Sequence, residues 1–267
     1  MTAKLEPDAV AALLNTNKLG RRIVFSESTA STNADAKFFG RGSAVDGTLF
    51  LTARQTAGRG RRGRSWLSDE GALCFTLLIR PEFHMTLAPR LVIACAVGAC
   101  RALRSYGVKA EIKWPNDIVV GGKKLCGILC EADQKGFVAA GMGINVNQKA
   151  FQNDISQTAC SLYTETGEEH DMNAVAAGVI NECEGLFALC ASDEGYAGLI
   201  GEYLSMCATI GRKVRVIAPD GEYEGEAVGL DAQGRLRVRC DKGRIKVVNA
   251  GDVSIRPAEG QKKTEEN

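Results

Sequence analysis

The sequence at residues 110–147 reads AEIKWPNDIVVGGKKLCGILCEADQKGFVAAGMGINVN, and this stretch decides the fold class. Apolar and β-branched residues form strand-like segments at 110–114, 118–120, 125–131 and 137–147. The pair Gly121-Gly122 predicts a two-residue hairpin, which joins antiparallel strands. Strands that follow one another without a helix between them do not show the repeat of a doubly wound sheet. We therefore predict a mixed α+β fold.

Further helical and strand-like segments flank this stretch on both sides. The spacing of apolar residues predicts helices within 1–20, 33–39, 87–106 and 172–206, and strands at 21–25, 48–54 and 72–79. From Lys213 the pattern changes to short alternating strands at 214–217, 222–228, 236–239 and 245–248, separated by turn residues. Such strands are typical of a small β-barrel. The polar residues 258–267 are expected to be disordered.

The composition is that of a globular protein without an overall charge bias. Of the 267 residues, 45% are hydrophobic, and 33 basic side chains stand against 32 acidic ones, for a net charge of +1. A protein that binds DNA usually carries a basic excess, so any basic patch in this chain must be local. No apolar run reaches the length of a membrane span, and Met1–Val10 lacks the layout of a signal peptide.

The ten cysteines read as small buried hydrophobes rather than as disulfides or metal ligands. Cys126 and Cys130 are one residue too far apart for a CxxC motif. His84 and His170 are the only histidines, so a zinc site is not expected. These features favour a cytoplasmic location.

Residues 58–66, called the arginine loop below, read GRGRRGRSW and concentrate positive charge in one place. Four arginines and three glycines occupy the first seven of these positions. Like charges repel and glycines lose much entropy on ordering, so a polyanionic ligand is the natural counterpart. Guanidinium groups bind phosphate oxygens in pairs, and glycines let the backbone come close. A solvated basic loop or an RNA-binding segment is the alternative, and the P-loop pattern is absent.

Two further motifs lie within the strand-rich stretch. Lys113–Asp117 reads KWPND and ends a strand, and its last two residues are types that hold a turn through side-chain bonds. Lys124 leads into an apolar strand, where its ammonium can meet a carboxylate and a phosphate together, whereas Lys123 reads as a solvated lysine. The glycines of 141–147 let a flat ligand approach the backbone, and Asn145 offers a donor and an acceptor to an adenine.

Taken together and in this order, the motifs resemble those of biotin protein ligases. The matching segments are Ser31–Asn33, residues 55–66, Lys113–Asp117, Lys124–Leu129 and Gly143–Asn145. The resemblance covers residues 20–257, and the arginine loop followed by KWPND is its most specific part. In that family a mixed sheet packed with helices, similar to that of class II synthetases, forms the catalytic domain, and an SH3-like barrel follows. The resemblance thus implies a catalytic domain at 1–208 and an SH3-like domain at 209–257.

The resemblance also implies roles for single residues. The expected biotin-binding residues are Ser31, Thr32, Asn33, Gln55, Gly58, Arg59, Gly60, Arg61, Lys124, Gly127, Leu129, Gly141 and Gly143. The expected nucleotide-binding residues are Arg61, Arg62, Arg64, Trp66, Lys113, Asn116, Asn145 and Arg256. Among these, Lys124, Arg59 and Arg61 are the expected catalytic residues, because cations must neutralise a carboxylate and a phosphate that approach each other.

The implied activity has two steps. Biotin reacts with ATP, with Mg²⁺, to give biotinyl-5′-AMP, and biotin then passes to a lysine of a biotin carboxyl carrier protein. A lipoate ligase or a non-enzymatic RNA-binding module is the alternative that the sequence leaves open. Residues 1–20 are too few for the winged helix of family members that repress transcription, so we expect no DNA binding. Because no apolar run is long enough to span a membrane, we expect no membrane partner. The sequence leaves a homodimer open.

Overall fold

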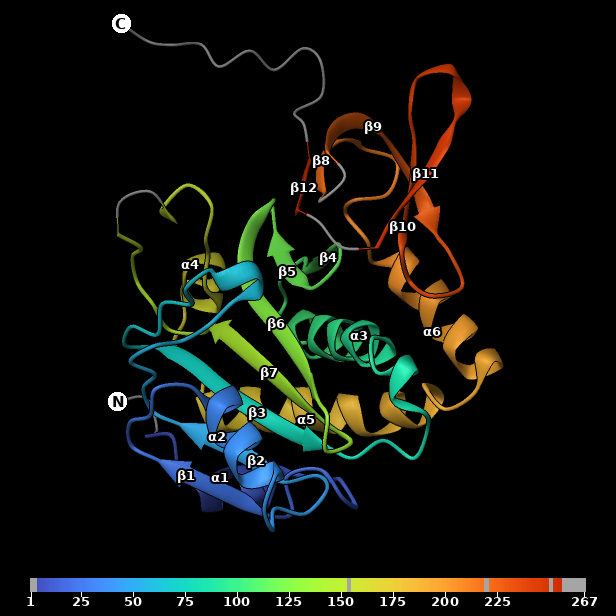
Figure 1. Ribbon diagram of the computed structural model, residues 1–267. Coiled ribbons are helices and arrows are strands. Elements are labelled where there is room, and N and C mark those ends of the chain that lie inside the picture. Colours follow the sequence, from blue (N-terminus) through green and yellow to red (C-terminus); the bar gives the residue numbers. More distant parts are fainter. Residues whose placement is uncertain (1–3, 153–154, 219–220, 250–251, 256–267) are drawn as a thin grey trace, which may run out of the picture. The chain divides into compact units, whose positions relative to one another are not determined.

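The computed structural model describes residues 4–152, 155–218, 221–249 and 252–255, and it divides into two units, Met1–Met206 and Cys207–Asn267 (Figure 1). The first unit is a mixed sheet with helices, and the second is a small antiparallel sheet. The predicted fold class is thereby confirmed. The predicted domain boundary after residue 208 falls close to the division after Met206, and the predicted tail at 258–267 lies outside the described residues.

Seven strands form the sheet of the first unit. In chain order they are β1 (Ile23–Ser26), β2 (Leu49–Thr52), β3 (Ala72–Ile79), β4 (Glu111–Lys113), β5 (Asp117–Val120), β6 (Lys123–Asp133) and β7 (Phe137–Asn145). Their order across the sheet is β1-β2-β3-β7-β6-β5-β4, and all neighbours are antiparallel except β1 and β2. Gly121 and Gly122 have φ values of 56° and 83° and close the β5–β6 hairpin, as their sequence predicts.

Helices cover both faces of this sheet. They are α1 (Pro7–Leu13), α2 (Thr32–Gly40), α3 (Arg90–Arg104), α4 (Leu162–Thr166), α5 (Met172–Leu189) and α6 (Asp193–Ser205). Helices α3 and α5 pack together on one face, while α2 packs on the other, across β2, β3 and β7 (Figure 1). Strands β3 and β7 are consequently buried along their whole length, with side chains alternating between the two faces.

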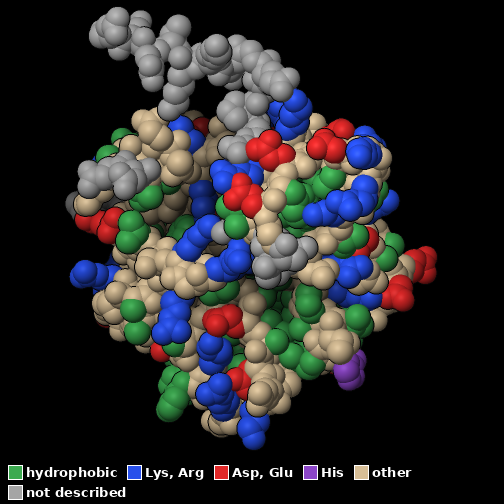
Figure 2. Space-filling model, turned by 45° about the horizontal axis from the view of Figure 1, so that its top comes forward, with side chains coloured by type: hydrophobic (Ala, Val, Ile, Leu, Met, Phe, Trp, Pro, Cys, Tyr) green, Lys and Arg blue, Asp and Glu red, His purple; other side chains and the backbone are tan. Residues whose placement is uncertain are grey.

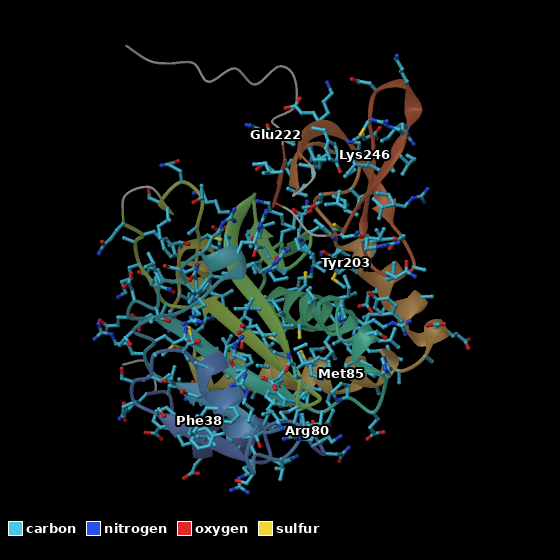
Figure 3. The ribbon with its side chains drawn as sticks, viewed as in Figure 1. Phe38, Arg80, Met85, Tyr203, Glu222 and Lys246 are labelled. Carbon is cyan, nitrogen blue, oxygen red and sulfur yellow. The ribbon has the colours of Figure 1, made fainter. Side chains whose placement is uncertain are left out.

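One end of the α2 face is a small hydrophobic core. Its buried members are Ala36, Phe50, Leu78, Phe137 and Ala139. The guanidinium of Arg80 lies over the Phe137 ring and donates to the carbonyl of Gly40, which closes this end, while Phe38 is 74% exposed and points away from it (Figure 3). This core anchors α2, so that the first turn of the helix lies farther along the same face of the sheet.

The N-terminal segment differs from the helix predicted within residues 1–20. Helix α1 ends at Leu13, because Leu14 is extended with a ψ of 130°. The next residues bond to α5 instead of continuing the helix. The backbone N–H groups of Asn17, Lys18 and Leu19 donate to the Glu184 carboxylate. Nothing in the local spacing of apolar residues reveals a partner so distant in the chain.

We predict that Glu184→Gln lowers the free energy of unfolding at neutral pH by about 1–2 kcal/mol, because a neutral amide oxygen is a weaker acceptor. Burial alone raises the pKa of Glu184, but its three backbone hydrogen bonds and Arg21 hold that pKa below the ordinary value. The carboxylate therefore stabilises the fold above the ordinary glutamate pKa. This contribution is lost as the pH falls through the lowered folded value. Urea unfolding should show the two proteins converging at acidic pH, and a difference independent of pH would contradict the prediction.

Two helical segments also differ from the sequence prediction. The helical segment 172–206 is two helices, because α5 ends at Leu189 and Ser192 begins α6 by accepting a hydrogen bond from the Gly195 N–H. The short helix α4 is not predicted by the sequence pattern. Ser161 caps it through the N–H of Thr164. A helix this short is not detectable from apolar periodicity, which needs a longer window.

The second unit is a five-stranded antiparallel sheet in the order β11-β10-β9-β8-β12. Its strands are β8 (Lys213–Ala218), β9 (Gly221–Leu230), β10 (Leu236–Arg239), β11 (Ile245–Val248) and β12 (Asp252–Ile255). The four strands predicted from alternation are present, and β12 pairs with β8 as a fifth. Along β10 the side chains of Leu236 and Val238 are buried and those of Arg237 and Arg239 are exposed, as alternation requires.

Charged side chains are mixed over the surface. Figure 2 shows Lys and Arg side chains with Asp and Glu among them on the face that it presents, in keeping with a net charge of +1. Within the part of the chain that the structure describes, no helix is long and apolar enough to cross a membrane.

Candidate functional site

Three glycines on neighbouring strands leave a flat surface on the α2 face of the sheet. The strand register places Gly127 of β6 opposite Gly143 of β7, and Leu129 opposite Gly141. Gly141 and Gly143 are two residues apart on β7 and therefore face the same side. Because none of the three glycines carries a side chain, larger groups can approach the backbone. Gly127, Gly141 and Gly143 are called the glycine floor below.

The arginine loop folds into a hairpin. The Trp66 N–H donates to the carbonyl of Gly58 over 2.9 Å, and the Gly60 N–H donates to that of Arg64 over 2.7 Å. Arg62 lies at the tip, with a φ of 56°. A Cβ on Gly58 would lie 2.5 Å from the Trp66 carbonyl oxygen, so the two ends of the hairpin approach as closely as only glycine permits. Its four arginines thus place four guanidinium groups on one short hairpin.

Trp66, at the end of this hairpin, lies on the glycine floor. A Cβ on Gly143 would be 2.3 Å from its ring, and one on Gly127 would be 3.1 Å from it. Cys74 of β3 pairs with Gly143 and is buried. Burial raises the pKa of the Cys74 thiol to about 11, despite a hydrogen bond with Ser68 that lowers it. The Cys74 thiol is thus uncharged at neutral pH.

Lys124 places its ammonium at the edge of the glycine floor. Its Nζ lies 2.7 Å from Asp117 Oδ1 and 5.6 Å from the centre of a Trp66 ring. A Cβ on Gly127 would be 3.0 Å from the same nitrogen. The Lys124 side chain is 37% exposed, so the cation is accessible to an anionic ligand. The neighbouring Lys123 is exposed.

The KWPND turn has partners on both sides. Asn116 Oδ1 accepts a hydrogen bond from Arg61 over 2.9 Å, and the Asn116 amide donates to a β6 carbonyl, so the turn holds the arginine loop against the sheet. The buried Tyr203 of α6 donates to the carbonyl of Pro115 (Figure 3). The sequence reading weighs a purely turn-holding role for Asp117. Its carboxylate also forms an ion pair with Lys124 at the edge of the glycine floor.

Polar side chains line the other end of the glycine floor. Thr76 Oγ1 of β3 lies 2.7 Å from Asn33 Oδ1 and 2.8 Å from Thr32 Oγ1. Gln55 Oε1 accepts from the Thr32 N–H over 2.9 Å and lies 3.1 Å from its hydroxyl oxygen. Ser31 precedes them as the buried N-cap residue of α2. These side chains offer several hydrogen-bonding groups within a small space.

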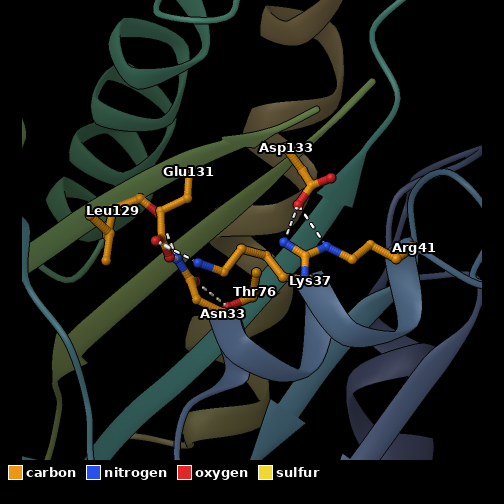
Figure 4. Close-up of polar contacts among 7 residues, drawn as sticks. All are labelled: Asn33, Lys37, Arg41, Thr76, Leu129, Glu131 and Asp133. Atoms are coloured by element: carbon orange, nitrogen blue, oxygen red, sulfur yellow. Dashed lines mark hydrogen bonds and ion pairs between the residues drawn. The ribbon is translucent and has the colours of Figure 1, made fainter. Parts of the chain in front are cut away.

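The Asn33 amide rests directly on the glycine floor. A Cβ on Gly141 would lie 1.9 Å from Asn33 Oδ1. The amide nitrogen donates to the Leu129 carbonyl and to the carboxylate of Glu131, which also pairs with Lys37 (Figure 4). Leu129 therefore contributes its backbone carbonyl at this point.

Asn145 is engaged inside the protein. Its amide nitrogen donates to the carbonyl of Cys160 over 2.9 Å and to that of Lys124 over 3.3 Å, and its oxygen accepts from Gln148 over 3.0 Å. These bonds hold the end of β7 to the start of β6 and to the segment before α4. The adenine contact expected for Asn145 stays a prediction, and such a contact has to share atoms that already have protein partners.

The structure brings most of the expected residues to one surface, but not all of them. The α2 turn, the arginine loop and the β6 and β7 residues meet at the glycine floor, whereas Lys113 ends β4, paired with Asp117, and Arg256 lies outside the described residues. Sequence reasoning missed Thr76 and Glu131. Two signals were available for them: a threonine inside the apolar run ALCFTLLI, and an acid at the end of KLCGILCE.

Comparisons with known proteins identify the family. The family model described as Biotin/lipoate A/B protein ligase family matches residues 25–147, and that of the Biotin protein ligase C terminal domain matches residues 209–256. The bifunctional ligase/repressor BirA of Bacillus spizizenii is 32% identical to this chain, over 94% of this chain and 79% of the relative. The chain belongs to the biotin protein ligase family.

Two further relatives agree with this assignment. The biotin–[acetyl-CoA-carboxylase] ligase of Mycobacterium tuberculosis is 33% identical, over 84% of this chain and 85% of the relative. The biotin protein ligase from Aquifex aeolicus, solved in complex with biotin and ATP, has a TM-score of 0.78 and 30% identity, and the match covers 89% of this chain and 100% of that one. The enzyme class predicted from the motifs, biotin–protein ligation, is thereby confirmed.

Proposed function

We propose that this biotin protein ligase first joins biotin to ATP, which gives biotinyl-5′-AMP and pyrophosphate, and then transfers biotin to a lysine of a biotin carboxyl carrier protein. The observation that carries the proposal is the position of Lys124, whose ammonium lies at the edge of the glycine floor beside Asp117 and Trp66. An accessible cation there can neutralise a carboxylate and a phosphate as they approach each other. The Aquifex relative was solved with biotin and ATP, which supports both substrates.

Biotin is proposed to lie along the glycine floor, with its ring system towards Asn33 and its carboxylate towards Lys124. The ring end of the site consists of Ser31, Thr32, Asn33 and Gln55, with the carbonyl of Leu129. Amide and hydroxyl groups are the partners that a cyclic urea needs, because it donates two N–H groups and accepts at its oxygen. Because the Trp66 ring itself lies on Gly127 and Gly143, this placement requires the ring to move aside, so that the side chain of biotin takes its place on the floor.

The arginine loop is proposed to bind the phosphates. Arg59 and Arg61 are assigned to the reacting phosphate, and Asn116 supports this by holding Arg61 through a 2.9 Å hydrogen bond. Arg62 and Arg64, with the backbone of Gly58 and Gly60, complete the loop around the adenylate. Trp66 is assigned to the boundary between the two ligands. Lys113, Asn145 and Arg256 are proposed to contact the nucleotide.

Mg²⁺ is proposed to arrive with ATP rather than to occupy a site made by the protein. Across the described ranges, no group of three His, Cys, Asp or Glu side chains could hold a metal ion. Asp117, at the edge of the site, is already paired with Lys124. Mg²⁺ is commonly bound through substrate phosphates with one or two carboxylates, so the nucleotide substrate is written as Mg–ATP.

The proposed chemistry needs no covalent enzyme intermediate. A biotin carboxylate oxygen attacks the α-phosphorus of ATP, an O–P bond forms, and the bond to pyrophosphate breaks. The amine of the carrier lysine then attacks the biotinyl carbonyl carbon, an amide forms, AMP leaves, and the amine loses a proton. Water would destroy the mixed anhydride between the two steps, so a loop that covers it favours transfer over hydrolysis.

The carrier protein and the cellular location are inferred from other observations. The relative from Mycobacterium tuberculosis is named for acetyl-CoA carboxylase, which supports a carboxylase carrier domain as the acceptor. We further propose a cytoplasmic location. All ten cysteines are free, and most of them are buried, which is usual for a protein in a reducing compartment.

Mass spectrometry of a purified biotin carboxyl carrier domain tests the proposal. After incubation with the protein, biotin and ATP, we expect a mass increase of one biotinyl group. The increase should be absent without ATP, and absent when the acceptor lysine of the carrier is changed to arginine. Lipoate supplied in place of biotin tests the lipoate alternative, because the family matched at 25–147 includes both ligases. No increase with biotin would contradict the proposal.

A further inference from the structure

The side-chain amide of Asn33 is bound on three sides. Its nitrogen donates to the Glu131 carboxylate over 2.8 Å and to the Leu129 carbonyl over 3.1 Å, and its oxygen lies 2.7 Å from the hydroxyl of Thr76 (Figure 4). The oxygen and nitrogen ends of an amide have almost the same shape, so hydrogen-bond partners decide which way the group is turned. Two acceptors on β6 and one hydroxyl on β3 therefore fix its orientation.

Glu131 is the partner that most strongly fixes this orientation, because a carboxylate can only accept hydrogen bonds. Its Oε1 lies 2.7 Å from Lys37 Nζ, and the two side chains are 29% and 27% exposed. Burial alone raises the pKa of Glu131, but the hydrogen bonds from Lys37 and Asn33, with the charges of Lys37 and Arg59, hold that pKa below its ordinary value. Glu131 is thus an ionised acceptor at neutral pH, and Asn33 turns its nitrogen towards it.

The orientation of Asn33 determines the direction of the hydrogen bonds that lead to Gln55. The Thr76 hydroxyl donates its single proton to Asn33 Oδ1, so it can only accept at its 2.8 Å contact with Thr32. Thr32 then donates its hydroxyl proton to Thr76, and its N–H holds Gln55 Oε1 over 2.9 Å. A reversed Asn33 would donate to Thr76, and both hydroxyl protons would point the other way, towards Gln55.

We propose that Glu131 is a positioning residue for biotin binding. By fixing the Asn33 amide, it sets the pattern of donors and acceptors that the protein presents to the ring end of biotin, without touching biotin itself. This inference rests on the proposed function, in which Thr32, Asn33 and Gln55 line the biotin site. In a reversed Asn33, the amide nitrogen would take the place of the oxygen and would set a donor against the N–H donors of the cyclic urea. A polar site whose groups are left unpaired rejects its ligand strongly.

A second ion pair provides a matched control. Arg41, the C-cap residue of α2, pairs with Asp133 of β6 over 2.7 Å, and Asp133 follows Glu131 by two residues on the same face of the strand (Figure 4). Both pairs tie α2 to β6. The Asp133 carboxylate, however, accepts from Arg41 and from the Lys135 N–H, rather than from Asn33. Asp133→Asn therefore removes a tie between the two elements without changing the partners of Asn33.

The test measures KM for biotin, KM for ATP and kcat by pyrophosphate release, together with the melting temperature, for wild-type protein, Glu131→Gln and Asp133→Asn. We expect Glu131→Gln to raise the KM for biotin about tenfold, the loss typical of one hydrogen bond to a charged group. The KM for ATP and kcat should change less than about twofold in this variant, and both KM values should stay within that range in Asp133→Asn. A merely structural role lowers the melting temperature of both variants alike. An unchanged KM for biotin in Glu131→Gln would overturn the proposal.

Variants of the residues in this series of hydrogen bonds show whether Glu131 acts through Asn33. Adding Glu131→Gln to Asn33→Ala should leave the KM for biotin within about twofold of that of Asn33→Ala alone, and independent effects would overturn the proposal. If Asn33→Ala binds biotin as tightly as wild type, the proposed biotin site is wrong. If Asn33→Ala weakens binding and Glu131→Gln does not, the site stands and only the positioning role is wrong.

A further variant covers the case in which Glu131→Gln does not fold. Thr76→Val removes the hydroxyl that follows Asn33 in the series of hydrogen bonds. It keeps the shape of the side chain and leaves the Lys37–Glu131 ion pair in place. We expect it to raise the KM for biotin as Glu131→Gln does, with the KM for ATP unchanged. A Thr76→Val protein with wild-type KM for biotin would overturn the proposal.

Discussion

Lys124→Ala is expected to lower the rate of biotinyl adenylate formation at least about a hundredfold, as when one charge-stabilising group is removed from an active site. Its Nζ lies 2.7 Å from Asp117 Oδ1 at the edge of the glycine floor. The substitution removes the cation and leaves the Asp117 carboxylate uncompensated where two anionic substrates are proposed to meet. Repulsion is thereby added to the lost attraction. Pyrophosphate release measures the rate, and circular dichroism checks that the protein is folded.

Two further variants make this result specific to Lys124. Lys123→Ala removes the exposed neighbouring lysine and should leave the rate within about twofold of wild type. Adding Asp117→Asn to Lys124→Ala removes the uncompensated carboxylate and should recover part of the lost rate. An active Lys124→Ala protein would contradict the proposed role. An equal loss in Lys123→Ala would show that only the net charge at this edge matters.

Gly141→Ala is expected to weaken biotin binding at least about a hundredfold, because the ring end of the site loses its hydrogen-bond pattern. The added Cβ would lie 1.9 Å from Asn33 Oδ1 and 2.8 Å from the carbon that carries it. Asn33 cannot move aside without breaking its bonds to Thr76, Leu129 and Glu131. We also expect the free energy of unfolding to fall by about 1–3 kcal/mol, as in other overpacked interiors. Titration calorimetry with biotin and urea unfolding measure the two effects.

The control for Gly141→Ala is the same substitution at Gly178 of α5, where a Cβ would meet nothing within 4 Å. This variant should bind biotin normally and gain about 0.5–1 kcal/mol of stability, since alanine favours the helix. Adding Asn33→Ala to Gly141→Ala removes the clash, and should restore stability without restoring affinity. Normal biotin affinity in Gly141→Ala would show that biotin does not depend on the Asn33 amide.

The fold was predictable wherever burial follows from the local sequence. Strand β3 is predicted at 72–79 and lies at Ala72–Ile79, because a strand buried on both faces is a continuous apolar run. The β5–β6 hairpin follows from two glycines that accept positive φ. The end of α1 was not predictable, because Glu184 holds the next residues from a position 165–167 residues away in the sequence.

The site was predictable as a set of motifs, and less so as a set of contacts. Lys124 and the arginine loop carry a charge pattern that points to an anionic ligand. Glu131 acquires its role only when β6 lies beside β7 and beneath α2, and it is 98 residues from Asn33 in the chain. The sequence also does not reveal that the fold uses the Asn145 amide to join β7 to β6, and the contact of Asn145 with adenine stays a prediction.

Strand β6 meets both ends of the proposed biotin molecule, with Lys124 near its start and Leu129 five residues later. The Lys124 ammonium reaches Gly127, where a Cβ would lie 3.0 Å from its Nζ, and Gly127 precedes Leu129 by two residues, about 7 Å of extended strand. Covalent geometry and the hydrogen bonds of the sheet fix that spacing. An acid with a shorter or longer chain between ring and carboxylate reaches both contacts only if the Lys124 side chain moves. We therefore expect strand β6 to favour a substrate by its length, independently of the polar groups that are proposed to recognise the ring.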